Sequence, residues 1–222
     1  AVRGGARCIR AVVPDICPKA ASRLLLVFYV LVGALGCEGH SNSPTQPAAL
    51  GKCGVYPDWQ NSAYILPYPV GGSYRVSQAN CTDYSHSGLL SYAFDFEMPI
   101  GTSVAAARGG VVVHVIEEFL DGDDEWYHSN LVRIGHGDGS YALYAHLTRN
   151  GALVEIGQSV VAGEIIALSG NTGYTLDLPH LHFQVAPCSF YENCGTLPVT
   201  FRNTAPNPQG LLYGLYYTAY AD

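Results

Sequence analysis

The chain has 222 residues, of which 48% are hydrophobic and only 13% are charged, enough for one domain plus a tail. Its 25 glycines, 16 tyrosines and 13 prolines favour short strands joined by tight turns, so we expect an all-β protein. Of the 18 acidic and 11 basic residues, one and five precede Cys37, so the chain from Cys37 onward has a net charge of −11. This charge excludes nucleic acid and anionic membrane surfaces as partners.

Residues 1–37 are typical of an export signal. Arg23 precedes the apolar run LLLVFYVLVGAL, which is shorter than the roughly 20 residues of a membrane span and fits a signal-peptide core. The run ends at ALGC, which resembles a bacterial lipoprotein cleavage box with Cys37 as the lipidated residue. A cleaved signal with a chance cysteine, and hence a secreted protein, is the alternative. We expect an exported protein of the periplasm or cell envelope, anchored to a membrane through Cys37, with residues 38–52 as a linker.

The rest of the chain is predicted to consist of strands and turns. Residues 53–85, rich in Tyr, Pro, Ser and Gly, are expected to form an irregular N-terminal extension with one strand at most. In 109–119 the valines at 111, 113 and 115 alternate with other largely apolar residues, as in a strand between packed layers. After residue 90 no useful segment has the period of a helix. We predict antiparallel sheets packed as a sandwich or half-open barrel, with strands in 92–98, 103–107, 109–119, 130–137, 141–147, 163–170 and 180–187.

Cysteine usage agrees with export. Three of the seven cysteines, including Cys37, lie in the signal region, and the other four allow three pairings. Proximity favours Cys188 with Cys194 and then Cys53 with Cys81, which would attach the N-terminal extension to the domain. A tetrathiolate zinc site is the competing interpretation, but no CxxC spacing supports it.

The stretch LPHLHF at 178–183 places two histidines one residue apart. On a strand, His180 and His182 point to the same face while Leu181 and Phe183 enter the core. A spacing of about 7 Å suits one histidine as a metal ligand and the other as a group that acts on the bound water.

Two further residues are candidates. Asp95 lies between Phe94 and Phe96, where a buried carboxylate is costly without a partner or a metal. His146 ends the expected strand 141–147, although a lone histidine of this kind is more often structural than catalytic.

Four segments in register resemble the lysostaphin-type zinc endopeptidases, which cut peptide cross-links in bacterial cell walls. The segments are FDFEMPIGTSVAAARGGVVV, NLVRIGHGDGSYALYAHL, GALVEIGQSVVAGEIIALSGNTG and PHLHFQV, and the similarity covers roughly residues 86–187. Each segment alone is weak evidence, whereas four in the family's order are strong. The resemblance implies a zinc endopeptidase domain over residues 86–222.

The resemblance also implies roles for individual residues. The family binds zinc through the His and Asp of an HxGxD-type motif and through the second His of HxH. Carried over, Asp95 and His182 are zinc ligands, and His146 and His180 are the catalytic pair that acts on water and substrate.

The chain departs from the family pattern at the first ligand. Ser91 stands four residues before Asp95, where the family has histidine. His86 is the nearest candidate, because it keeps the family's His-x-Gly with Gly88, and five extra residues separate that pair from the FDF strand. A catalytic zinc needs three protein ligands, so we predict that an inserted loop brings His86 to the metal. The alternative is a loop histidine in a domain that has lost its metal.

The function implied is zinc-dependent hydrolysis of peptidoglycan, with its peptide stems as the substrate. A metal-free module of the same fold, which binds the wall or regulates another hydrolase, is the alternative. The acidic loop 120–125, LDGDDE, lacks the spacing of an EF-hand calcium loop, so we interpret it as a solvated rim of the substrate groove.

Overall fold

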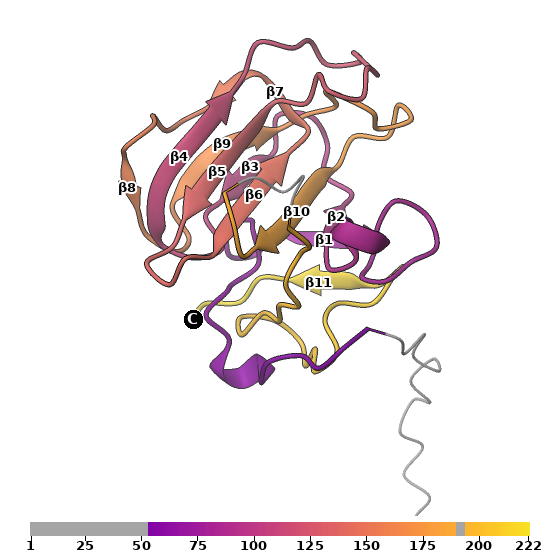
Figure 1. Ribbon diagram of the computed structural model, residues 1–222, viewed down its shortest axis with the longest axis vertical. Coiled ribbons are helices and arrows are strands. Elements are labelled where there is room, and N and C mark those ends of the chain that lie inside the picture. The colour runs from indigo at the N-terminus through magenta and orange to yellow at the C-terminus, as the bar shows by residue number, and fades with distance from the viewer. Residues whose placement is uncertain (1–52, 190–193) are drawn as a thin grey trace, which may run out of the picture. The chain divides into compact units, whose positions relative to one another are not determined.

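The computed structural model describes residues 53–189 and 194–222, which form the all-β structure of Figure 1. The described residues contain no α-helix and two short 3-10 helices, η1 (Trp59–Asn61) and η2 (Gly88–Leu90). The strands are β1 (Ser73–Gln78), β2 (Phe94–Phe96), β3 (Ser103–Ala105), β4 (Gly110–Ile116), β5 (Leu131–Gly135), β6 (Tyr141–Ala145), β7 (Leu147–Ala152), β8 (Ser159–Val160), β9 (Ile165–Ser169), β10 (Leu181–Ala186) and β11 (Tyr216–Thr218). The predicted all-β class is confirmed. The predicted export signal and linker, 1–52, lie outside the described residues.

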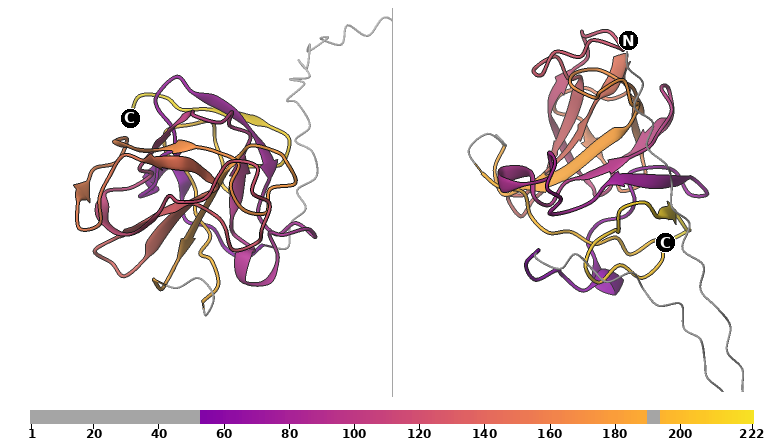
Figure 2. Two further views of the ribbon diagram at one scale, coloured as in Figure 1. Left: turned by 90° about the horizontal axis from the view of Figure 1, so that it is seen from above. Right: turned by 90° about the vertical axis from the view of Figure 1, so that its right-hand side faces the viewer.

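The strands form two antiparallel sheets. The larger sheet has the order β11-β1-β2-β10-β6-β5-β4-β8, and the smaller has the order β3-β9-β7. Apolar side chains of both sheets, among them Val112, Tyr144, Ile166 and Phe183, share one core. The sheets therefore pack on each other as the predicted sandwich, and Figure 2 shows this arrangement from two further sides.

Strands from both ends of the described chain extend the larger sheet. β1 lies in the N-terminal extension, residues 53–85, and pairs with β2 on one side and with β11 on the other. Figure 1 shows β11, close to the C-terminus, beside β1. Sequence analysis did not predict β7, β8 or β11. β8 and β11 are only two and three residues long, and β7 (LTRNGA) is rich in residues with low strand propensity.

The interpretation of β4 as a strand buried on both faces is wrong. Val112 is buried, whereas Val111 and Val113 are 43% and 40% exposed. β4 lies next to the edge of the larger sheet, and the edge strand β8 pairs only with Gly110 and Val111. The outer face of β4 therefore has no layer above it, in spite of its apolar sequence.

Both predicted disulfides are present. Cys53–Cys81 joins the start of the described chain to the segment after β1, and Cys188–Cys194 links residues that follow β10. Among the described residues, we find no helix with the length and apolar character needed to cross a membrane.

Candidate metal centre

Three neighbouring strands of the larger sheet bring the candidate residues together. In the order β2-β10-β6, Asp95 is the register partner of His182, and His182 is the register partner of Ala145. His146 follows directly after Ala145. The neighbours of His182 on β10 are fully buried in the core, so its side chain lies on the opposite face, as the i, i+2 spacing predicted.

His86, Asp95 and His182 form a group that could hold a metal ion, with ligand atoms that all lie within 4.8 Å of one another. Asp95 Oδ1 is 3.2 Å from His86 Nε2 and 2.9 Å from His182 Nδ1. His86 Nε2 is buried and makes no hydrogen bond within the described residues, a deficit that a bound cation would remove. Two imidazole nitrogens and one carboxylate oxygen form a donor set of the catalytic zinc type, so these residues fit the predicted zinc cofactor.

His86 reaches the centre from a loop, 79–92, that connects β1 to β2. The His86 side chain is fully buried, and its Nδ1 donates to Ala79 O at 3.2 Å, which leaves Nε2 for a metal. Ser91 instead donates its hydroxyl to Gly88 O at 2.7 Å, within the turn of η2. The structure therefore brings His86 to the centre through the additional loop and keeps Ser91 away from it.

His146 and His180 lie next to the metal group. Their ring centroids are 4.6 Å apart, and His180 Nε2 is 3.8 Å from Asp95 Oδ1. His146 donates from Nδ1 to Thr172 O, and His180 donates from Nδ1 to Leu178 O, both at 2.7 Å. Each ring therefore keeps Nε2 as the nitrogen that can exchange a proton with a substrate or water.

The backbone of His146 is in the left-handed conformation, with φ 61°. His146 is the single residue between β6 of the larger sheet and β7 of the smaller one. Its backbone N–H donates to Ser129 Oγ at 3.1 Å. A left-handed residue other than glycine costs about 1–2 kcal/mol, and such residues cluster at functional sites.

Burial and a single carboxylate control the charge of the centre. Burial would raise the pKa of Asp95, but the surrounding histidines lower it well below its usual range through their charges and hydrogen bonds. Burial, together with the charges of the nearby His180 and His182, lowers the pKa of His146 to about 3. Burial also lowers the pKa of His182, but its hydrogen bond with Asp95 outweighs this and leaves the pKa raised. His146 is therefore neutral near pH 7, with a lone pair on Nε2.

Sequence analysis missed Gln184. Gln184 is 1% exposed and follows His182 by two residues on the same face of β10. Its Oε1 lies 2.9 Å from His182 Nε2, and a hydrogen bond from that nitrogen leaves a lone pair on Nδ1 once His182 has lost the proton that bonds to Asp95. The alternation that identified the histidine pair could have indicated Gln184, because it continues through HLHFQ.

The centre lies in a groove with a volume of about 540 Å³. Aromatic and aliphatic side chains line much of the groove, including Tyr84, Trp126, Tyr174 and Leu176. A hydrogen bond with Tyr84 raises the pKa of Tyr174, so loop 79–92 and the segment that follows β9 interact at the groove. The groove is suited to an extended chain with small or apolar side chains.

The acidic loop 120–125 is largely exposed, as predicted, and two of its carboxylates also make hydrogen bonds to a neighbouring segment. Asp121 Oδ1 accepts a hydrogen bond from the backbone N–H of Asn171 at 2.6 Å. Asp124 Oδ1 accepts from the backbone N–H of Thr175 at 3.0 Å. Trp126, which follows this loop, lines the groove. The carboxylates therefore hold the segment 171–176 that carries part of the groove wall.

Comparisons with known proteins identify relatives of the region that contains the centre. The model of peptidase family M23 matches residues 90–193. Peptidoglycan DD-endopeptidase ShyA of Vibrio cholerae is 37% identical over 122 residues, which are 53% of this chain and 26% of that protein. Lysostaphin of Staphylococcus simulans is 35% identical over 120 residues, 54% of this chain and 22% of that protein. Glycyl-glycine endopeptidase ALE-1 of Staphylococcus capitis is 36% identical over 120 residues, 54% and 31% of the two chains.

Among solved structures, the catalytic domain of lysostaphin from Staphylococcus simulans matches with a TM-score of 0.42 and 30% identity, over 56% of this chain and 87% of that chain. The chain spans about a quarter of the length of the curated relatives that it matches. The matched range 90–193 contains Asp95, His146, His180 and His182, whereas His86 precedes it. His86 and most of the loop 79–92 that carries it thus precede the family match, which begins at residue 90.

Proposed function

The chain belongs to peptidase family M23, and from that premise we propose that it is a zinc-dependent endopeptidase that hydrolyses peptide cross-links of bacterial peptidoglycan. The observation that carries the proposal is the convergence of three possible zinc ligands, with two further histidines beside them, at one groove that all of them except the buried His86 line. The names of the relatives, a peptidoglycan DD-endopeptidase and a glycyl-glycine endopeptidase, support the substrate class.

We assign the zinc ligands to His86 Nε2, Asp95 Oδ1 and His182 Nδ1. Zinc, when bound, supplies Lewis acidity that polarises a scissile carbonyl and makes water a stronger nucleophile near neutral pH. The low pKa of Asp95 keeps its carboxylate ionised, as a ligand must be.

His146 and His180 carry the proton transfers in this proposal. Because Nδ1 of each ring is held by a backbone carbonyl, Nε2 is the atom that exchanges protons. The two rings share two tasks, accepting the proton of the attacking water and protonating the leaving amine. Burial of His146 keeps its imidazole neutral near pH 7.

Substitution of each histidine tests these roles. His182→Ala is expected to lose zinc and activity together. His146→Ala and His180→Ala are expected to keep zinc and to lose on the order of 10²- to 10⁴-fold in cleavage rate, the usual size of an acid–base contribution. The measurement is product release from cross-linked muropeptides at neutral pH, with zinc determined on the same preparations. His114→Ala, in β4, is the matched control and should behave as wild type.

Three outcomes would contradict parts of the proposal. Wild-type protein with full zinc that cuts no cross-link would exclude the enzyme and favour a wall-binding or regulatory module. Loss of zinc in His180→Ala would indicate that His180, rather than His182, is the zinc ligand on β10. Unchanged zinc in His86→Ala would remove His86 from the ligand set.

We also propose that the protein is exported and that acyl groups on Cys37 anchor it in the cell envelope. The apolar run before ALGC supports this, as do the two disulfides, which suit an oxidising compartment. Metabolic labelling with a fatty-acid probe should mark the wild-type protein, and Cys37→Ser should abolish the label. A label that persists in Cys37→Ser would contradict the lipid anchor.

A further inference from the structure

Loop 79–92 delivers one of the three candidate ligands but has little packing of its own. Between Ala79 and Ala93, His86 is the one buried residue, and Asp83, Tyr84 and the stretch 87–89 are exposed. Segments with few buried apolar contacts open at low free-energy cost. Contacts other than a hydrophobic anchor must therefore hold His86 in place.

The Cys53–Cys81 disulfide fastens this loop five residues before His86. Cys81 has left-handed backbone geometry, with φ 52°, and its N–H donates to Ser91 O at 2.6 Å. This hydrogen bond closes the base of the loop. The conformation is unfavourable for a residue other than glycine, so it depends on the contacts around it.

The segment that contributes Cys53 is itself braced against the same loop. The backbone N–H of Gly54 donates to the Tyr92 hydroxyl at 2.9 Å. The rings of Tyr56 and Tyr92 meet edge to face at 5.9 Å, and the Tyr56 hydroxyl hydrogen-bonds with the side chain of Asn80 at 2.9 Å. Residues 53–56 therefore pack against the loop, and the disulfide joins them to it covalently.

Apart from the 3.2 Å approach of His86 Nε2 to Asp95 Oδ1 and the hydrogen bond of Tyr84 with Tyr174, neutral hydrogen bonds hold the part of the loop around His86. His86 Nδ1 donates to Ala79 O at 3.2 Å, and the Gln78 side chain bonds with Ser85 Oγ at 2.8 Å. Such bonds contribute little net stability in competition with water. The disulfide is the one covalent restraint between the described loop and the rest of the domain, apart from the chain itself.

We propose that the Cys53–Cys81 disulfide positions the metal ligand His86, so that the protein holds zinc tightly only in its oxidised form. This inference rests on the zinc site proposed above. With the disulfide open, the loop samples conformations in which His86 is away from the centre. The apparent dissociation constant for zinc rises in proportion to the loss of the competent population.

The redox step is an ordinary disulfide reduction. A phosphine such as tris(2-carboxyethyl)phosphine breaks the S–S bond, two thiols form with protons from water, and the phosphine takes the oxygen of that water as phosphine oxide. A chain that meets an oxidising compartment only after export would thus complete its metal centre there.

The experiment compares zinc dissociation constants of the full chain by competition with a chromogenic chelator. The double variant Cys53→Ser/Cys81→Ser should bind zinc on the order of ten-fold or more weakly than wild type. The matched control Cys188→Ser/Cys194→Ser, which removes the other disulfide, should retain wild-type affinity. If the first variant does not fold, phosphine treatment of the folded control protein opens only Cys53–Cys81 among the two disulfides described and gives the same comparison.

A double-mutant cycle with His86→Ala distinguishes positioning from a general loss of stability. If the disulfide acts through His86, its removal from the His86→Ala background should change zinc affinity by less than two-fold. An equal loss in both backgrounds would overturn the proposal, as would wild-type affinity in Cys53→Ser/Cys81→Ser. Wild-type protein that binds no zinc would contradict the proposed function itself, and with it this inference.

Discussion

Each histidine of the centre has one ring nitrogen committed to a hydrogen-bond acceptor. His86, His146 and His180 donate from Nδ1 to backbone carbonyl oxygens. His182 has the opposite orientation and donates from Nε2 to Gln184 Oε1. A neutral imidazole has one donor and one lone pair, so these acceptors determine which nitrogen of each ring is available to a metal or a proton.

At the residue scale, we predict that Gln184 sets the zinc affinity through His182. Gln184→Leu removes the acceptor and should weaken zinc binding by about 10- to 100-fold, the usual effect of removing the partner of a metal ligand. Gln184→Glu retains an acceptor at the same place and should restore most of the affinity. Competition with a chelator measures both, and Gln60→Leu, at an exposed glutamine in η1, is the control.

Two outcomes would contradict this role for Gln184. The first is wild-type zinc affinity in Gln184→Leu. The second is equal weakness in the Leu and Glu variants, which would indicate that packing in the groove matters and the acceptor does not.

At the scale of elements, aspartate carboxylates hold two of the turns around the sheets. Asp121 accepts hydrogen bonds from Asn171 N and from the Thr148 hydroxyl, and so connects the acidic loop to the segment after β9 and to β7. Asp138 accepts from the backbone N–H and the hydroxyl of Ser140, within the turn between β5 and β6. Both carboxylates satisfy backbone donors that the strands leave unpaired.

We predict that Asp121→Ala loosens the groove wall without affecting the metal. Amide hydrogens in 171–176 should exchange faster, and KM for a muropeptide substrate should rise several-fold, because the wall segment loses its charge-assisted bond. Zinc affinity should stay unchanged. Asp123→Ala is the matched control, because Asp123 bonds only within its own loop, to Glu125 N and His128. Unchanged exchange in 171–176 would contradict this role of Asp121.

The turn at Asp138 gives a pH-dependent prediction. Hydrogen bonds from Ser140 and Arg108 hold the pKa of Asp138 well below its usual range. A carboxyl group with a lower pKa in the folded than in the unfolded state contributes stability above its unfolded pKa, and this contribution is lost as pH falls towards the folded pKa. Asp138→Asn should therefore be less stable than wild type at pH 7, and the difference should shrink below about pH 4. Urea unfolding at several pH values measures it, and a difference that is constant with pH would contradict the charge-based explanation.

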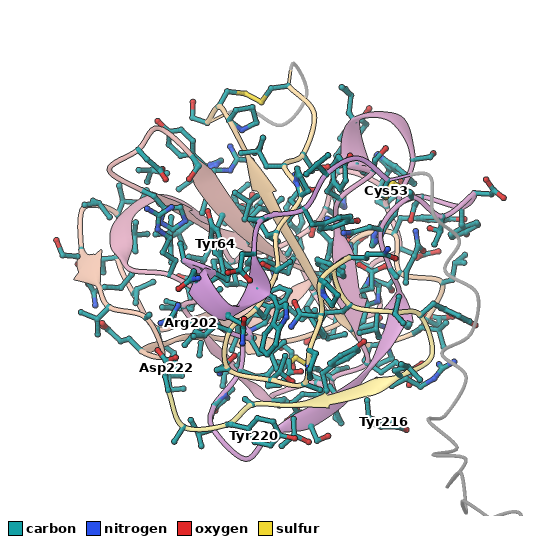
Figure 3. All side chains as sticks on the ribbon, turned by 90° about the horizontal axis from the view of Figure 1, so that it is seen from below. Cys53, Tyr64, Arg202, Tyr216, Tyr220 and Asp222 are labelled. Atoms are coloured by element: carbon teal, nitrogen blue, oxygen red, sulfur yellow. A yellow bond between two sulfur atoms is a disulfide. The ribbon has the colours of Figure 1, made fainter. Side chains whose placement is uncertain are left out.

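At the scale of the described domain, the segment after β10 completes the core under the metal centre. Phe201 is fully buried, and its ring centroid lies 5.6 Å from that of Phe94 and 5.9 Å from that of Phe183. These two rings belong to β2 and β10, the strands that carry Asp95 and His182. Figure 3 labels Arg202 and Asp222, whose side chains form an ion pair that ties the C-terminus to this segment.

We predict that Phe201→Ala lowers the free energy of unfolding by about 3–5 kcal/mol, the usual cost of removing a buried aromatic ring. Zinc affinity should also fall, because the cavity that the substitution leaves lies beneath β2 and β10, the two strands that carry Asp95 and His182. Tyr216→Ala, at a side chain that is 68% exposed, should change stability by less than about 0.5 kcal/mol. Urea unfolding measures both variants, and a loss in Phe201→Ala as small as that of the control would show that the segment contributes little to the core.

Local patterns were sufficient to predict most of the strands, and together with the family resemblance they named five of the six residues that the structure places around the centre. In 180–187 the alternation of the sequence is strict, so the inward Leu181 and Phe183 and the outward His182 could be read directly. The same alternation misled us at β4, because whether an apolar face is covered depends on the neighbouring strands. Gln184 was missed because its function depends on the orientation of a ring two residues away.

The sequence by itself determined the all-β class, the pairs of cysteines nearest in the chain and the strand residues Asp95 and His182, because side-chain direction on a strand has a period of two residues. Only the tertiary structure decided that β2, β10 and β6 are neighbours, that His146 turns the corner between the two sheets, and that His86 rather than Ser91 faces Asp95. The physical reason is that sheet order and loop closure depend on contacts between residues far apart in the chain. The Cys53–Cys81 bond, which spans 28 residues, is one of them, and no local pattern records where such contacts place a side chain.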